Sequence, residues 1–189
     1  SIGIIAIIIG FLFHKPLTGE FTFGGPDSLS PSAVHQGVTL AEEEYGKYPL
    51  WLPWIFSGLP SVHSFQNISD YYFPNFFINM LTSLGFPGFW GYIFHFILAG
   101  MGVFSLLKKL GISGYCALFG GLTFALMPYL ITMVVHGHGS QMMTTAWLPW
   151  VIWAILRLYD DTSIKNLGIL GLIVGLQMQR SHVQIAYYS

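Results

Sequence analysis

Charged residues are scarce in this sequence, since Asp, Glu, Lys and Arg make up only 8% of its 189 residues. A soluble domain carries roughly 25%, so an ordinary water-exposed surface is excluded, and the few basic residues form no patch that would bind nucleic acid. Cysteine is nearly absent as well. The single Cys116 can form no disulfide within the chain and is expected to pack as a small residue in the core or against lipid.

Apolar residues are abundant instead, at 53% of the chain, and aromatic residues reach 17%. Five apolar runs approach the length of about 20 residues that a helix needs to cross a bilayer. These runs cover residues 2–13, 86–107, 114–135, 142–158 and 164 onward. They predict an all-α membrane protein, a polytopic transmembrane helix bundle of about five spans. Pro128 and Pro149 fall inside two of the runs, where neighbouring helices can satisfy the freed backbone groups.

The chain is expected to form the N-terminal part of one transmembrane domain. A first span at 1–13 precedes a long outer loop at 14–85, and four further spans occupy 86–189. Two segments of the loop, YPLWLPWIF and YYFPNFFINML, are predicted to form interfacial or re-entrant helices, with a soluble subdomain as the alternative. The sequence starts without Met and stops inside an apolar pattern, so we expect a piece of a longer protein.

The basic residues predict the orientation in the membrane, because positive charges remain on the cytoplasmic side. Two short loops hold most of them, and these loops are therefore expected to be cytoplasmic. The residues concerned are Lys108, Lys109, Arg157 and Lys165. The long loop at 14–85 and the motif at 136–141 then lie together on the outer side.

The outer loop begins with the motif GGPDSLSP at residues 24–31. A turn at its glycines would hold Asp27 at the membrane boundary. Asp27 either caps a short helix or acts as a general base close to the lipid surface.

A second polar motif, QRSHVQ at residues 179–184, lies in the last apolar run. An ionisable residue in a membrane helix indicates function unless it reaches the interface, and Arg180 could do so by snorkelling. On a continuous helix Arg180 and Gln184 would share a face through i, i+4 spacing, and Gln177 would join them. Such a polar stripe suits an anionic head group such as a phosphate.

The third motif is HGHGSQ at residues 136–141, in which glycines alternate with His136 and His138. The glycines make a regular helix unfavourable there. A bare His-x-His pair without further ligands is a weak metal signal. A pigment or haem ligand is a further alternative, for which His95 is the best-placed residue. Hydrogen bonding of the two imidazoles to a polar substrate or to Asp27 is the interpretation that the sequence favours.

Taken in order, several motifs resemble one family of membrane proteins. GGPDSLSP, PLWLPWIFSGLPS, YYFPNFFINML, HGHGSQ, AWLPW and RSHVQIAYY together look like the N-terminal part of the YfhO-type bacterial proteins, which belong with the GT-C class of glycosyltransferases. This resemblance implies an enzyme of the bacterial cytoplasmic membrane that transfers a sugar from a polyprenyl-phosphate carrier to an acceptor on the outer face.

The resemblance also implies roles for individual residues. Asp27 would be the catalytic base, and Arg180 with His182 would approach the carrier phosphate. Many members of the class have a second acidic residue beside the first, whereas Pro26 and Ser28 stand here, so a divalent metal or other cofactor is not expected. The full set of expected substrate-binding residues is Arg180, His182, His136, His138, Gln141 and Gln184.

A non-catalytic membrane subunit of a larger complex, for example an energy-converting one, is the main alternative. The small-residue spacing of Gly168, Gly171 and Gly175 suits close packing against other helices, so the expected partners are membrane lipids and further subunits. A transporter is a weaker alternative, because no inverted repeat is visible.

Overall fold

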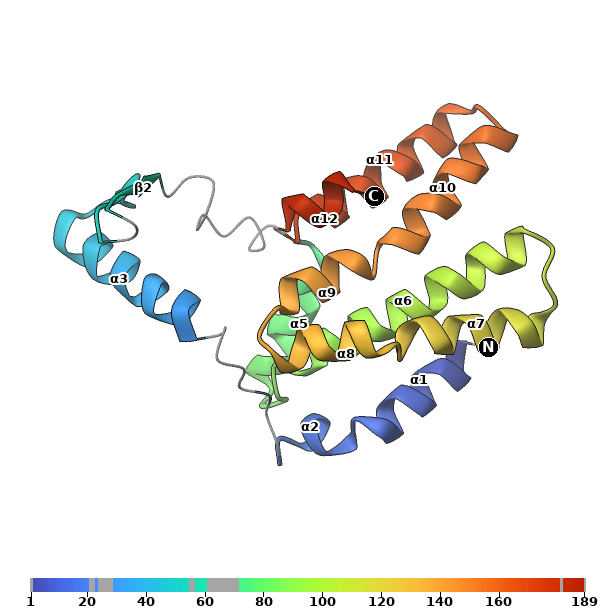
Figure 1. Cartoon of the computed structure of the whole chain (residues 1–189), viewed down its shortest axis with the longest axis horizontal. Helices are drawn as coiled ribbons and strands as arrows, with labels where there is room; N and C mark the ends of the chain where they lie inside the picture. Colours follow the sequence, from blue (N-terminus) through green and yellow to red (C-terminus); the bar gives the residue numbers. More distant parts are fainter. Residues whose placement is uncertain are drawn as a thin grey trace.

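The computed structural model describes residues 2–20, 23, 29–54, 57–60, 72–180 and 182–188, and most of them lie in helices (Figure 1). The one strand pair in these ranges is antiparallel, with β1 (Trp51–Leu52) beside β2 (Leu59–Pro60). The all-α class predicted from composition is confirmed. The helices are α1 (Ile2–Leu12), α2 (His14–Thr18), α3 (Leu29–Tyr45), α5 (Pro74–Ser83), α6 (Trp90–Lys109), α7 (Gly114–Ala125), α8 (Pro128–Val135), α9 (Gly139–Thr145), α10 (Leu148–Asp160), α11 (Ile164–Met178) and α12 (Val183–Tyr187).

Within the described ranges, two helical segments are long and apolar enough to cross a membrane. One is α6, and the other runs from Gly114 to Val135 and consists of α7 followed by α8. Two shorter apolar helices, at Gly3–Leu12 and Ile164–Met178, fall below that length. By length and composition, the described residues thus contain two candidate membrane spans, and the predicted bundle of five spans is not confirmed.

Prolines divide two of the predicted spans into shorter helices. Between α7 and α8, Met127 is extended, with φ −63° and ψ 142°, because a residue that precedes proline avoids the helical region. Pro149 occupies one of the first two positions of α10, where a missing N–H costs no helical hydrogen bond. The run at 142–158 is accordingly shared by α9 and α10.

The central helix of the bundle is α6, which packs against α1, α7, α9 and α10 (Figure 1). Side chains such as Ile5 on α1 and Phe96 on α6 are fully buried there. Cys116 is exposed on α7, which agrees with the lipid-facing alternative for this residue.

The crossing of α6 and α7 depends on Gly100 of α6 and Gly121 of α7. A Cβ atom at Gly121 would lie 2.6 Å from the backbone carbonyl oxygen of Gly100, whereas the nearest atom to a Cβ at the neighbouring Gly120 is a terminal methyl carbon of Leu107, at 2.6 Å. A backbone carbonyl cannot move without its helix, but a leucine methyl group can rotate away. Gly121 therefore sets the distance between the two helices.

We expect Gly121→Ala to lower the free energy of unfolding by about 1–3 kcal/mol, as overpacking typically does. Gly120→Ala is the matched control, since it makes the same change one residue away, and it should be neutral or stabilising by up to about 1 kcal/mol through helix propensity. Thermal unfolding of both variants in detergent micelles measures the difference. Equal stability of the two variants would contradict the close α6–α7 contact.

The two aromatic segments of the first loop have different outcomes. YYFPNFFINML was predicted to form an interfacial or re-entrant helix, and α5 covers most of it, so its helical character is confirmed. The helix predicted for YPLWLPWIF is wrong, because its described part holds β1 and a turn. Pro49 and Pro53 explain the difference, since each removes a backbone donor and interrupts a helix. The helix α3 was not predicted, although its run Glu42, Glu43 and Glu44 is exposed as a solvated face would be.

Candidate functional site

Arg180 lies immediately beyond the end of α11, in a turn that brings its side chain into the protein. Its backbone N–H donates to the carbonyl of Gln177 at 3.2 Å, and the residue is only 8% exposed. This position corrects one prediction. Because α11 ends at Met178 and α12 begins at Val183, the continuous helix that would align Gln177, Arg180 and Gln184 on one stripe does not form.

The guanidinium group of Arg180 contacts three residues from distant parts of the chain. Its central carbon lies 4.8 Å from the centroid of the Tyr72 ring, within the range of a cation–π interaction. One terminal nitrogen donates to Oδ1 of Asn75 at 3.4 Å, and the other approaches Sδ of Met143 at 2.6 Å. A neutral amide, a thioether and an aromatic face thus surround the positive charge.

No carboxylate neutralises this charge within the part of the chain that the structure describes. There the salt bridge is between Lys109 and Asp160, and Nε of Arg180 is buried without a hydrogen-bond partner. Burial lowers the pKa of the Arg180 guanidinium from its ordinary value, while the nearby Tyr72 hydroxyl opposes that change. Arginine nevertheless remains charged in proteins. A buried charge without a counterion is costly, so this environment suits an anionic ligand.

Tyr72 is held beneath Arg180 by a buried hydrogen-bond network. The indole N–H of Trp147 donates to the Tyr72 oxygen at 3.1 Å, and this hydroxyl lies 2.9 Å from Nε2 of His95. Nδ1 of His95 lies 2.7 Å from the carbonyl of Gly91, which can only accept. Nδ1 therefore carries the proton, and the Tyr72 hydroxyl donates to Nε2.

This network has two consequences. Burial raises the pKa of Tyr72 to about 12, although the Trp147 hydrogen bond and the Arg180 charge act in the opposite direction, so the phenol stays neutral beneath the guanidinium. Both ring nitrogens of His95 have hydrogen-bond partners, and the side chain is fully buried. The alternative that His95 is a hydrogen-bonded core residue is therefore confirmed, and both of its ring nitrogens are engaged within the protein.

Residues 136–138 of the HGHGSQ motif form the irregular connection between α8 and α9 that its glycines predicted, whereas Gly139, Ser140 and Gln141 are helical and begin α9, contrary to that prediction. Gly137 has φ +93°, and Gly139 lies so close to the ring of Tyr92 that any Cβ there would collide with it. His136 ends α8, is exposed, and has Nδ1 2.9 Å from the carbonyl of Thr132. His138 is half-buried and directly precedes α9.

Two of the predicted site motifs meet where α9 contacts α12. His182 precedes α12, and its pKa is lowered by burial first of all, while a backbone hydrogen bond raises it and the charge of His138 lowers it further. Met143, which touches Arg180, also lies on α9. The structure therefore places His138 and Met143 on the segment that packs beside His182 and α12, whereas His136 is exposed to solvent. Gln141 is half-buried on α9 and Gln184 is exposed on α12.

The predicted catalytic base, Asp27, lies outside the described residues. Among the residues that are described, no three His, Cys, Asp or Glu side chains gather as a metal site would require.

The lowered pKa of His182 predicts a pH dependence. The His182 ring takes up a proton near pH 6.5 in the unfolded chain, but only at lower pH in the folded chain. The stability that neutral His182 contributes is therefore complete above about pH 6.5 and is lost as the pH falls. An NMR titration of the His182 ring should show a midpoint below 6.5. His138→Gln should raise this midpoint, and the exposed His14→Gln should leave it unchanged. A midpoint at or above 6.5 in the unsubstituted protein would contradict the half-buried position of His182.

Four residues of the Arg180 environment were not predicted from the sequence. Three of them lie in aromatic segments that are typical of membrane-interface anchors, namely Tyr72, Asn75 and Trp147. The fourth, Met143, is typical of a core residue. The polar Asn75 inside YYFPNFF was the one available signal, because an amide in an otherwise apolar helix requires a partner.

Comparison of the chain with protein-family models, curated proteins and solved structures gives no match. The fold and site by themselves define an all-α protein with two helical segments capable of crossing a membrane. The site of this protein is the buried Arg180, which contacts Tyr72, Asn75 and Met143.

Proposed function

We propose that the chain is part of a GT-C-like membrane glycosyltransferase, which transfers a sugar from a polyprenyl-phosphate carrier to an acceptor on the outer face of a bacterial cytoplasmic membrane. The observation that carries this proposal is the buried guanidinium of Arg180, which has no carboxylate partner among the described residues. A phosphate would supply the missing negative charge, and arginine binds phosphate through paired, charge-assisted hydrogen bonds.

The reaction requires two contributions from the protein. The acceptor oxygen attacks the anomeric carbon of the sugar, and Asp27 takes the proton from the acceptor hydroxyl. The bond between the anomeric carbon and the phosphate oxygen breaks, and its electron pair leaves with polyprenyl phosphate. Arg180 stabilises the charge that develops on this leaving group, while His138 and His182 hydrogen-bond to the phosphate or the sugar. His136, Gln141 and Gln184 line the outer rim, and no metal or cofactor takes part.

The proposed topology has five spans, with residues 14–85 and 136–141 on the outer side. The ion pair of Lys109 with Asp160 supports this arrangement, because it joins the end of α6 to the end of α10. The basic residues of both short loops thus gather at one end of the bundle. Arg180 follows the opposite end of α11, as an outer-leaflet site requires.

A donor assay with the intact purified protein tests the proposal. The protein is given a labelled sugar either on a polyprenyl phosphate or on a nucleotide, together with membrane extract as the acceptor source. We expect transfer from the lipid-linked donor alone, with release of polyprenyl phosphate. Transfer that depends on the nucleotide donor, or absence of any binding to polyprenyl phosphate, would contradict the proposed function.

A non-catalytic membrane subunit is the second candidate, and one observation favours it. Among the described residues, nothing lies within 4 Å of a Cβ placed at Gly168, Gly171 or Gly175 on α11. This leaves a glycine face open for a helix from another protein. Purification in fixed stoichiometry with other subunits, and without a bound lipid carrier, would favour this candidate over the enzyme.

A further inference from the structure

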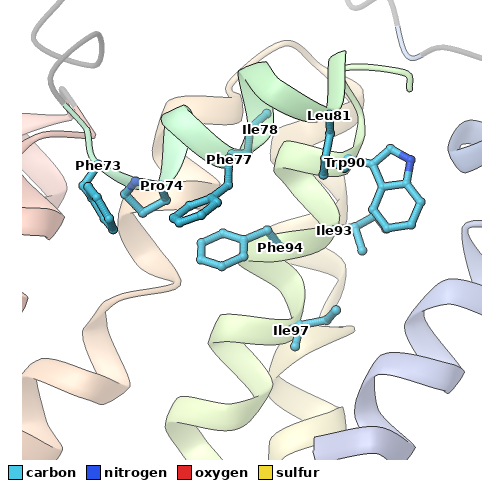
Figure 2. A pocket seen from close by; sticks show the side chains of 9 residues that line it. All are labelled: Phe73, Pro74, Phe77, Ile78, Leu81, Trp90, Ile93, Phe94 and Ile97. Carbon is cyan, nitrogen blue, oxygen red and sulfur yellow. The ribbon is translucent and has the colours of Figure 1, made fainter. Parts of the chain in front are cut away.

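A second feature of the molecule is an apolar groove between α5 and α6, which we call the α5–α6 groove (Figure 2). Its volume is about 380 Å³, and only apolar and aromatic side chains line it. Figure 2 shows Phe77 of α5 directed toward Phe94 of α6, with Ile97 one turn further along α6. The volume falls within the roughly 300–1,000 Å³ that is usual for ligand pockets.

The groove follows the axis of the candidate membrane span. Its lining runs along α6 from Trp90 to Ile97, a distance of roughly 10 Å at the helical rise per residue. The end at Trp90 is the start of α6, on the side opposite the basic residues Lys108 and Lys109. In the proposed topology the groove therefore begins at the outer head-group level and extends toward the centre of the bilayer.

The α5–α6 groove adjoins the Arg180 site through four consecutive residues, Tyr72 to Asn75. Phe73 and Pro74 line the groove, while Tyr72 and Asn75, which flank them, contact the guanidinium of Arg180. Neighbouring Cα atoms are only about 3.8 Å apart. A buried positive charge and an apolar groove thus lie within the length of one small amphiphile.

We infer that the α5–α6 groove holds the first part of the hydrocarbon chain of a lipid phosphate whose head group binds at Arg180. This inference rests on the proposed function and names the part of the donor that selects it. Charge complementarity identifies the occupant, because a neutral lipid would leave the guanidinium without a counterion. A phosphate without a chain would leave the apolar groove unfilled.

Two phosphate probes that share a head group separate the groove from the charge. One is a long-chain polyprenyl phosphate and the other is dimethylallyl phosphate, which ends after one isoprene unit. Ile97→Trp would fill the lower part of the groove. Leu172→Trp is the matched control, since it adds the same bulk on an exposed face of α11. Binding of both probes to the intact, detergent-solubilised protein is measured by calorimetry.

We expect Ile97→Trp to weaken binding of the long-chain probe by at least about tenfold, equivalent to about 1.4 kcal/mol, and to leave dimethylallyl phosphate unaffected. Leu172→Trp should change neither affinity. If Ile97→Trp does not fold, Leu81→Trp, at another position in the lining, provides the same comparison.

The outcomes distinguish the groove from the proposed function. If Ile97→Trp binds both probes as the unsubstituted protein does, or loses affinity for both equally, the α5–α6 groove does not hold the hydrocarbon chain. The proposed function is unaffected by either result. If the unsubstituted protein binds neither probe, the proposed function fails and this inference fails with it.

Discussion

Replacing Arg180 with Gln is expected to lower kcat/KM for transfer from a polyprenyl-phosphate donor by about 100- to 1,000-fold, the usual effect of removing one donor that stabilises developing charge. The kcat/KM of Arg180→Lys should lie between the values of the unsubstituted protein and of Arg180→Gln, because lysine keeps the charge but loses the planar pair of donors that matches a phosphate. Steady-state kinetics at several donor concentrations measure both variants.

The stability of the same variant separates a ligand-binding role from a structural one. Arg180 is buried and has no carboxylate partner among the described residues. The desolvation cost of its charge therefore offsets its contacts with Tyr72 and Asn75, and Gln should leave the unfolding temperature unchanged or raise it. Arg157→Gln is the matched control. Arg157 donates to Asn166 at 3.3 Å and stacks on Trp153 at 4.9 Å, so its loss should destabilise the fold without affecting transfer. A large loss of stability in Arg180→Gln, with normal kinetics in what folds, would contradict the binding role.

Asp27→Asn is expected to lower the transfer rate by about 100- to 10,000-fold, the range for removal of a general base. An amide keeps the size of the carboxylate but cannot accept the acceptor's proton at neutral pH. The pH profile should also lose the limb that reports ionisation of this carboxyl group. Glu42→Gln on the exposed face of α3 is the control and should have no effect. Unchanged transfer by Asp27→Asn would remove Asp27 from the mechanism.

The sequence predicted well those features that depend on local pattern. The long apolar run of α6 and the helix α5 were predictable because periodicity and composition specify a helix without reference to the rest of the chain. The irregular backbone around Gly137 was predictable from glycine alone. The pair of strands β1 and β2 was not predicted, because the aromatic residues of YPLWLPWIF are typical of an interfacial helix. The prolines on either side of Trp51 interrupt such a helix.

The features that were missed depend on long-range contacts. No glycine or proline marks the end of α11 at Met178, so the turn that buries Arg180 had no local signal. Tyr72 lies beneath Arg180 although 107 residues separate them in the chain, and nothing in its aromatic segment distinguishes it from an interface anchor. Arg180 itself was identified as functional because an ionisable residue in an apolar segment requires a partner.

The central claim is that Arg180 binds the phosphate of a lipid carrier. The most direct measurement is an experimental structure of the intact protein with polyprenyl phosphate bound. We expect two phosphate oxygens within about 2.7–2.9 Å of the Arg180 guanidinium nitrogens, as in other charge-assisted pairs. A phosphate bound elsewhere, with the guanidinium of Arg180 paired to a carboxylate of the protein, would contradict the claim.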